Sequence, residues 1–249
     1  QIEWGADEAI VDDPVERLRA PEPAAARPAA PAAPRPTPGA APRPAEAPRP
    51  AAERAQAAAD GANTIDELRA AIAAFDGCAL RDTATSAVFL AGDWTAPALL
   101  VGEAPTADDD RAGAPFSGAE GAYLDKMLAS AGLSRAGLLL APLIPWRPPG
   151  GRAPREPELA QCLPFLRRAV VLARPRRVVL LGRLAEKALL NTTVRRRAAS
   201  GWIDWVVPEL DAPIPTWVLP SVSALMRTPS SRKDAWTAWR ALRRFVDTQ

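Results

Sequence analysis

The sequence of 249 residues contains no histidine and only two cysteines, Cys78 and Cys162. The lack of histidine excludes Ser-His-Asp and Cys-His nucleophilic catalysis, imidazole acid–base chemistry and His-ligated metals. Two cysteines are too few for a disulfide scaffold or for a four-Cys zinc or iron–sulfur site within one chain. No run of about 18 apolar residues is present, so we expect no contact with a membrane. No signal peptide is visible after Gln1, and we therefore expect a cytoplasmic protein.

Proline and alanine are concentrated in one segment, because residues 21–50 contain 11 Pro and 11 Ala. This composition favours a disordered or partly polyproline linker, since proline cannot take part in a helical hydrogen-bond ladder. We expect the linker to cover residues 21–61 and a globular domain to cover residues 62–249. The acidic residues 1–20 precede the linker and include a few apolar side chains. This segment could dock to the domain or to a protein partner, or it could be the end of a truncated helix.

Charge is distributed unevenly along the chain, although the formal net charge is only +2. Residues 1–61 carry 7 Lys or Arg against 10 Asp or Glu, and the rest of the chain carries 24 against 19. The expected globular domain is therefore mildly basic, which favours an anionic partner.

Short apolar runs alternate with helical patterns over the expected domain. Strands are predicted at residues 87–90, 98–101, 138–140, 177–182 and 217–219, and helices at 64–75, 118–131, 158–173 (interrupted at Pro164) and 231–246. This order is typical of an α/β protein, a three-layer α/β/α sandwich with a short, mainly parallel central sheet. Ligands of such sheets bind beyond the carboxyl ends of the strands, which places residues 102–121, 142–155 and 220–229 near any site.

These three segments carry distinctive residues in a fixed order. They are Gly102-Glu103-Ala104-Pro105 with Pro115-Phe116 and Gly118, then Pro145-Trp146-Arg147-Pro148-Pro149-Gly150 with Arg152, then Pro220-Ser221 with Leu225, Arg227, Pro229 and Lys233. Together they resemble the motifs of the family 4 uracil-DNA glycosylases, and the likeness extends from about residue 63 to 246. The segments around Cys78 and Cys162 resemble the family's cluster-binding segments.

The resemblance implies a function in DNA repair. Members of the family flip uracil out of DNA and hydrolyse its N-glycosidic bond, because the bond is unreachable inside the base stack. The resemblance makes Glu103 the candidate water-orienting carboxylate and Phe116 the ring that stacks on the base. It also makes five residues candidates for DNA binding: Arg147, Arg152, Ser221, Arg227 and Lys233.

The sequence departs from the family at two positions that contact the base. The family's His, which donates to uracil O2 as negative charge develops there, is replaced by Leu219, and the base-reading Asn is replaced by Pro142. Neither side chain has a polar atom. Loss of one such donor costs about 10²–10³ in kcat, and loss of a substrate-reading group costs about 10⁴–10⁵ in discrimination.

The family's iron–sulfur cluster lacks half of its ligands here. Cys78 and Cys162 fill two of the four cysteine positions, and Phe75 and Val178 occupy the others. We therefore expect the cluster to be lost and no cofactor to replace it, with both cysteines acting as small buried apolar residues.

Several candidate residues have a second interpretation. Glu103 could cap a helix N-terminus, and Phe116 could be a core residue. The run Asp108–Asp110 is more typical of a solvated helix start than of a metal site. The basic runs at 174–177 and 195–197 could contact phosphates or only solvent.

Three functions remain open from the sequence. The first is a DNA-repair protein that binds DNA, single-stranded or uracil-containing, with excision lost or strongly weakened. The second is an active DNA glycosylase that hydrolyses the N-glycosidic bond of uracil or another damaged base through Glu103. The third is a protein-interaction module with a vestigial pocket.

Overall fold

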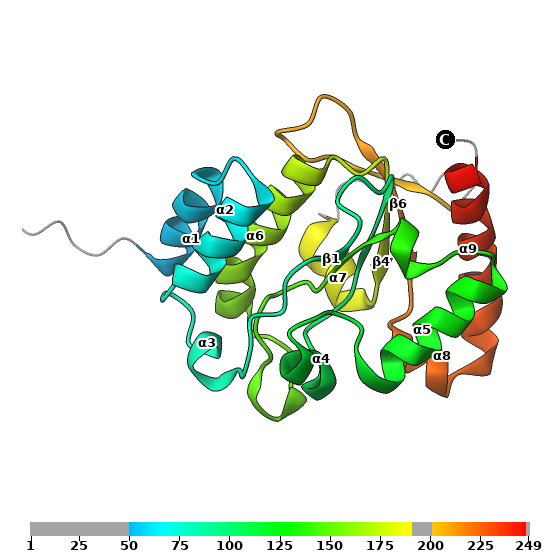
Figure 1. Ribbon diagram of the computed structural model, residues 1–249, viewed down its shortest axis with the longest axis horizontal. Helices are drawn as coiled ribbons and strands as arrows, with labels where there is room; N and C mark the ends of the chain where they lie inside the picture. The colour runs from blue at the N-terminus through cyan, green and yellow to red at the C-terminus, as the bar shows by residue number, and fades with distance from the viewer. Residues whose placement is uncertain (1–49, 191–200, 248–249) are drawn as a thin grey trace, which may run out of the picture. The chain divides into compact units, whose positions relative to one another are not determined.

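The computed structural model describes residues 50–190 and 201–247. The acidic segment 1–20, the linker as far as residue 49 and the basic run 195–197 lie outside the described residues. The described residues belong to one compact unit, 47–249. Within it, a six-stranded sheet lies between two layers of helices (Figure 1), which confirms the predicted three-layer α/β/α architecture.

The sheet has the strand order β1-β3-β2-β4-β6-β5. The four central strands, β3, β2, β4 and β6, run parallel to one another, and the edge strands β1 and β5 are antiparallel to their neighbours. The bounds are Ala91–Gly92 (β1), Ala98–Val101 (β2), Leu139–Ala141 (β3), Arg177–Leu181 (β4), Ile203–Trp205 (β5) and Ile214–Leu219 (β6). The parallel strands are apolar because helices cover both of their faces.

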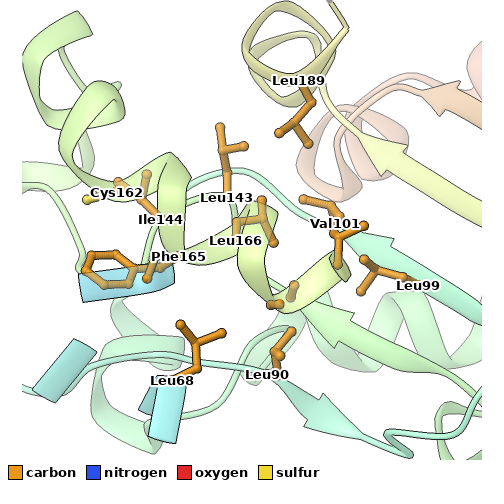
Figure 2. Packing of buried hydrophobic residues seen from close by; sticks show 14 of the residues in the cluster. Leu68, Leu90, Leu99, Val101, Leu143, Ile144, Cys162, Phe165, Leu166 and Leu189 are labelled. Carbon is orange, nitrogen blue, oxygen red and sulfur yellow. The ribbon is translucent and has the colours of Figure 1, made fainter. Parts of the chain in front are cut away.

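One layer of helices packs on the face to which Leu99, Val101 and Leu180 point. It consists of α1 (Ala51–Asp60), α2 (Ile65–Ala74), α6 (Glu156–Ala173) and α7 (Arg183–Leu189). Figure 2 shows this core, in which Leu166 of α6 lies near Val101 of β2, and Leu68 of α2 belongs to the same cluster. Alternation along each strand sends the neighbouring side chains to the other layer.

The second layer packs on the opposite face, against Leu100, Val179 and Leu181. It consists of α5 (Gly118–Ser130), α8 (Val222–Arg227) and α9 (Arg232–Asp247), seen together in Figure 1. Shorter helices lie in the connections between these elements: α3 (Leu80–Thr83), α4 (Ala107–Ala112) and the 3-10 turns η2 (Arg135–Gly137), η3 (Pro149–Gly151) and η4 (Pro229–Ser231). No helix of the described residues is long and apolar enough to cross a membrane.

The predicted linker ends earlier than expected, because residues 51–60 form α1. The last proline of the run is Pro50, and the following alanine-rich stretch has high helix propensity. Ala55 and Ala59 are fully buried, and α1 packs on α6. The linker prediction is therefore wrong for residues 51–60, where burial of small side chains stabilises a helix.

Two further predictions of secondary structure are wrong, and some elements were missed. Residues 87–90 form no strand. Val88 and Leu90 are buried, so the segment joins the core through its side chains. Its backbone does not pair in the sheet and donates a hydrogen bond from Val88 N to Pro145 O (2.7 Å). Pro164 does not interrupt α6, because the apolar residues around it are buried and stabilise the helix against the missing hydrogen bond. The strand β5 and the helix α7 were not predicted.

Candidate functional site

A cavity of about 300 Å³ lies at the carboxyl ends of the central strands. Its lining comes from the loops that follow β2, β3 and β6 and from the start of α7. The lining residues are Gly102, Glu103, Ala104, Pro105, Thr106, Asp109, Pro115, Phe116, Glu120, Ala141, Pro142, Gly151, Arg152, Ala153, Pro154, Leu181, Leu184, Ser221, Val222 and Ser223. The three segments expected to meet at the strand ends thus meet in this cavity, as the parallel topology requires.

Phe116 lines the cavity and is held in a strained backbone conformation. Its φ of 55° is unusual for a bulky residue, and such strain occurs most often at functional sites. Two glycines make room for it. A Cβ at Gly102 would lie 2.9 Å from the Phe116 ring, and a Cβ at Gly121 would lie 1.8 Å from its carbonyl oxygen. Phe116 also belongs to the buried core, so both interpretations of this residue are consistent with its position.

Glu103 lines the cavity and also caps α7. Its Oε1 accepts a hydrogen bond from the backbone N–H of Leu184 at 3.1 Å, in the first turn of that helix. The carboxyl lies so close to Gly182, which has a φ of 122°, that a Cβ there would be 2.3 Å from Oε1. The helix N-terminus therefore orients the Glu103 carboxylate at the edge of the cavity.

The run Asp108–Asp110 opens α4, but only Asp108 is substantially exposed. The buried Asp109 accepts hydrogen bonds from Thr106 N (2.8 Å) and Ser117 N (2.6 Å). The buried Asp110 accepts from two backbone N–H groups of the segment before β1, at 2.9 and 3.0 Å. The prediction of a solvated helix start is wrong for these two residues, whose carboxylates fix the loops around the cavity.

Glu120 was not singled out from the sequence. It lies in the first turn of α5, is half-buried and lines the cavity. Among the described residues no donor forms a hydrogen bond or ion pair with its carboxyl. Burial raises its pKa, the negative charges of Asp109 and Glu103 raise it further, and Arg227 lowers it. The sequence signal that could have identified Glu120 as a site residue was its position within residues 102–121, one helical turn after Phe116.

Pro142 and Leu219, which the motifs predict at the positions of the family's Asn and His, are placed differently. Pro142 lines the cavity directly after β3. Leu219 ends β6 and is buried in the second core layer, outside the cavity lining. Ser221 lines the cavity and caps α8, where its Oγ accepts from Ala224 N at 3.3 Å.

The basic residues expected to bind DNA fall into three environments. Arg152 lines the cavity but forms a two-pronged ion pair with Glu158, at 2.8 and 2.5 Å, which lowers the pKa of that carboxyl. Arg147 is half-buried, and its Nε is buried with no hydrogen-bond partner among the described residues. Arg227 and Lys233 are exposed on α8 and α9.

The basic run at 174–177 lies elsewhere. Arg177 begins β4, whereas the cavity lies at the carboxyl end of that strand. Its guanidinium packs over the ring of Phe245 at 4.3 Å. The run is therefore at the opposite end of the sheet from the cavity.

The residues at the four expected cluster positions do not fit an iron–sulfur cluster. Cys78 and Cys162 are buried with their sulfurs 3.9 Å apart, and the hydrogen bond from Cys162 lowers the pKa of the Cys78 thiol to about 7. The Phe75 ring packs on Phe165 and Trp146, with centroids 5.3 and 6.4 Å away, and Val178 is buried in the same core. No three His, Cys, Asp or Glu side chains of the described residues are placed to hold a metal ion.

Comparison with known proteins gives consistent matches. The family model of the uracil DNA glycosylase superfamily matches residues 89–243. The type-4 uracil-DNA glycosylase of Pyrobaculum aerophilum is 34% identical over 55% of this chain and 70% of its own length. Those of Archaeoglobus fulgidus and Sulfurisphaera tokodaii are 37% and 32% identical, over 51% and 52% of this chain and 64% and 59% of their own lengths. The chain thus spans about two thirds of the length of these curated relatives.

Proposed function

The chain belongs to the type-4 family of the uracil DNA glycosylase superfamily, and from that premise we propose that it binds DNA and takes an extruded base into the cavity, with uracil excision lost or strongly weakened. One observation carries this proposal. The cavity is open and is lined by Phe116 and Glu103, yet Pro142 contributes no polar side-chain atom to it and Leu219 lies in the core outside it.

The open cavity favours base binding over a vestigial pocket. A volume of about 300 Å³ exceeds the needs of one pyrimidine ring, and the strained Phe116 offers an aromatic surface on which a base can stack. Extrusion of the base remains chemically reasonable, because stacking and phosphate contacts require neither Asn nor His.

The expected weakness of excision follows from the same lining. If the losses of a charge-stabilising donor and of a substrate-reading amide both apply, they lower uracil excision by at least about 10⁵ in combination. Such a loss leaves DNA affinity largely intact, since phosphate contacts supply most of it.

Arg147 is the residue we propose for a phosphate contact. Its Nε is buried without a partner, and a buried guanidinium donor is stabilised by an anionic acceptor. Arg176 is a matched control, because it is exposed at the opposite end of the sheet. We expect Arg147→Ala to weaken binding to a labelled single-stranded oligonucleotide in fluorescence anisotropy and to reduce its salt dependence, whereas Arg176→Ala should do neither. Equal effects of the two substitutions would contradict this placement.

A single-turnover excision assay tests the proposal as a whole. Excess protein is incubated with a labelled single-stranded oligonucleotide carrying one uracil, abasic sites are cleaved with alkali, and DNA binding is measured in the same samples. We expect binding with little or no product. Rapid multiple-turnover excision would refute the weakened activity, and absence of DNA binding would refute the function.

A second candidate is residual glycosylase activity through Glu103, which is favoured by the position of its carboxylate at the edge of the cavity. Slow product formation by the wild-type protein that Glu103→Gln abolishes would support this mechanism. Product that is unchanged by Glu103→Gln would refute it and would point to a contaminating glycosylase.

A further inference from the structure

Trp236 on α9 is the only tryptophan of the described residues that is largely exposed to solvent. It is 40% exposed, whereas Trp239, three residues later on the same helix, is 1% exposed and packs in the core. Its indole ring takes part in none of the ring-to-ring contacts found among the described residues. Tryptophan is enriched at interaction surfaces, because the ring combines a large apolar area with a polar N–H. Packing within the domain does not explain this residue.

Positive charges flank Trp236 on the exposed face of α9. Lys233 precedes it by three residues and Arg240 follows it by four, and this spacing places the three side chains on one face of a helix. All three are exposed, whereas Ala235 and Leu242 are buried on the other face. Neither Lys233 nor Arg240 forms an ion pair with another described residue. This face of α9 therefore presents an aromatic ring between two free cations.

The first half of α9 lies at the cavity end of the sheet. Ser221, at the start of α8, lines the cavity, and Arg232 anchors the start of α9 to the end of α8 by donating to Leu225 O at 3.1 Å. Phe245, in the last turn of α9, packs against the first residue of β4, at the opposite end of the sheet. Figure 1 shows the same course of the helix, which starts beside α8. Trp236, in the second turn of α9, therefore lies on the cavity side.

The surface between the cavity and Trp236 is basic. Burial raises the pKa of Glu120, which lines the cavity, and the positive charge of Arg227 opposes this rise, so Arg227 lies within electrostatic range of the cavity. The helix α9 that follows carries five Lys or Arg against two Asp. A polyanion held at the cavity is therefore attracted along α8 and the start of α9.

We propose that Trp236 stacks on an unpaired base of the DNA strand next to the extruded nucleotide, and that Lys233 and Arg240 contact the phosphates beside that base. The inference rests on the proposed function and adds a second base-binding position outside the cavity. A ring flanked by cations fits single-stranded DNA, because every base offers a π face and the backbone offers negative charge. An apolar protein surface fits less well, since it would bury both charges without a partner.

Substitution of the ring tests the stacking directly. Fluorescence anisotropy with a labelled single-stranded oligonucleotide containing one uracil compares wild-type protein with Trp236→Leu and Trp236→Phe. Leucine keeps apolar bulk without a π face, whereas phenylalanine keeps a ring. We expect Trp236→Leu to weaken binding by about 5- to 150-fold and Trp236→Phe to retain most of the affinity. Val206→Ala is the control, because Val206 is 60% exposed and follows β5 at the opposite end of the sheet.

Salt dependence separates the ring from the cations. Lys233→Gln and Arg240→Gln should each reduce the slope of log K against log salt concentration by about 0.7, because each removes one phosphate contact to a single strand. Trp236→Leu should weaken binding without changing this slope, since an indole ring displaces no counterion.

Oligonucleotides that lack one base at a defined position beside the uracil locate the contact. Wild-type protein should lose affinity when the stacked base is missing, and Trp236→Leu should lose nothing further at that position, because the two changes remove the same interaction. Losses that add at every position tested on both sides of the uracil would contradict stacking.

The outcomes separate this inference from the proposed function. Equal affinity of wild-type protein and Trp236→Leu would overturn the inference in favour of a protein contact at this ring, and Trp236→Phe binding as weakly as Trp236→Leu would overturn it as well. Both results leave the proposed function in place, since the wild-type protein still binds DNA. Absence of DNA binding by the wild-type protein would overturn both. Thermal unfolding shows whether each variant keeps its fold, and we expect no change in Tm because the ring is exposed.

Discussion

Replacement of Asp109 by alanine should destabilise the protein and disturb the cavity together. The Asp109 carboxylate accepts hydrogen bonds from Thr106 N at 2.8 Å and from Ser117 N at 2.6 Å. The first bond closes the start of α4, and the second fixes the backbone directly after the strained Phe116. Alanine would leave two N–H groups without their acceptor.

The expected size of the effect follows from the two bonds. A hydrogen bond to a charged group contributes about 1.5–3 kcal/mol, so Asp109→Ala should lower the free energy of unfolding by about 3–6 kcal/mol. For a domain of this size, 1 kcal/mol corresponds to roughly 2–4 °C, and we therefore expect the Tm to fall by about 6–24 °C. Loss of the Asp109 charge should also lower the pKa of Glu120, because Asp109 is one of the groups that raise it.

The neighbouring residue supplies the control. Asp108 pairs with Arg111 on the surface of the same helix, and a surface ion pair contributes about 0–1 kcal/mol. Thermal unfolding followed by circular dichroism should therefore show a large loss for Asp109→Ala and a small one for Asp108→Ala. If the two variants unfold at the same temperature, Asp109 does not hold the loops as argued.

Three further predictions concern other parts of the fold. Gly182→Ala should cost about 1–3 kcal/mol in backbone strain and also displace the Glu103 carboxyl, so it should lower any Glu103-dependent excision. Gly150→Ala is the control, because its φ of 67° brings strain but the space around it is open. Equal excision by both variants would contradict this. Phe75→Ala should lower the free energy of unfolding in urea by about 3–5 kcal/mol, and a change below about 1 kcal/mol would show that its aromatic packing is unimportant. Glu158→Gln should lower the Tm at pH 7, and this loss should shrink as the pH falls. The pKa of Glu158 is lowered in the folded state, so its stabilisation is present above the ordinary pKa and is lost as the pH falls through the folded one. A loss of Tm that is the same at every pH would refute this.

The sequence predicted those features that depend on local pattern. The apolar runs at 98–101 and 177–181 became central strands, and their parallel order brought the three motif segments to one edge of the sheet. The helix α1 was missed, because composition averaged over a window did not register that the prolines stop at Pro50. The run at 87–90 was misassigned because apolar residues can be buried without pairing in a sheet.

The site was predictable in its location and less so in its chemistry. The positions of Pro142 and Leu219 in the motifs were read from the sequence, but only the structure separates a cavity-lining proline from a core leucine. The sequence alone does not indicate that Arg152 pairs with Glu158. The pKa of Glu120 is raised by burial and by the charges of Asp109 and Glu103, which come from other segments, so no local pattern around Glu120 could indicate this shift.

The groups that shape the cavity do not include the side chains at positions 142 and 219. Asp109, Gly182 and Phe116 fix the loops through hydrogen bonds, close approach and backbone conformation, and none of these interactions uses the side chain at position 142 or 219. A proline fits at 142 because the loop leaves β3 there, and a leucine at 219 adds to the core. The cavity therefore depends on Asp109, Gly182 and Phe116, and the side chains at positions 142 and 219 are free to vary without loss of the cavity.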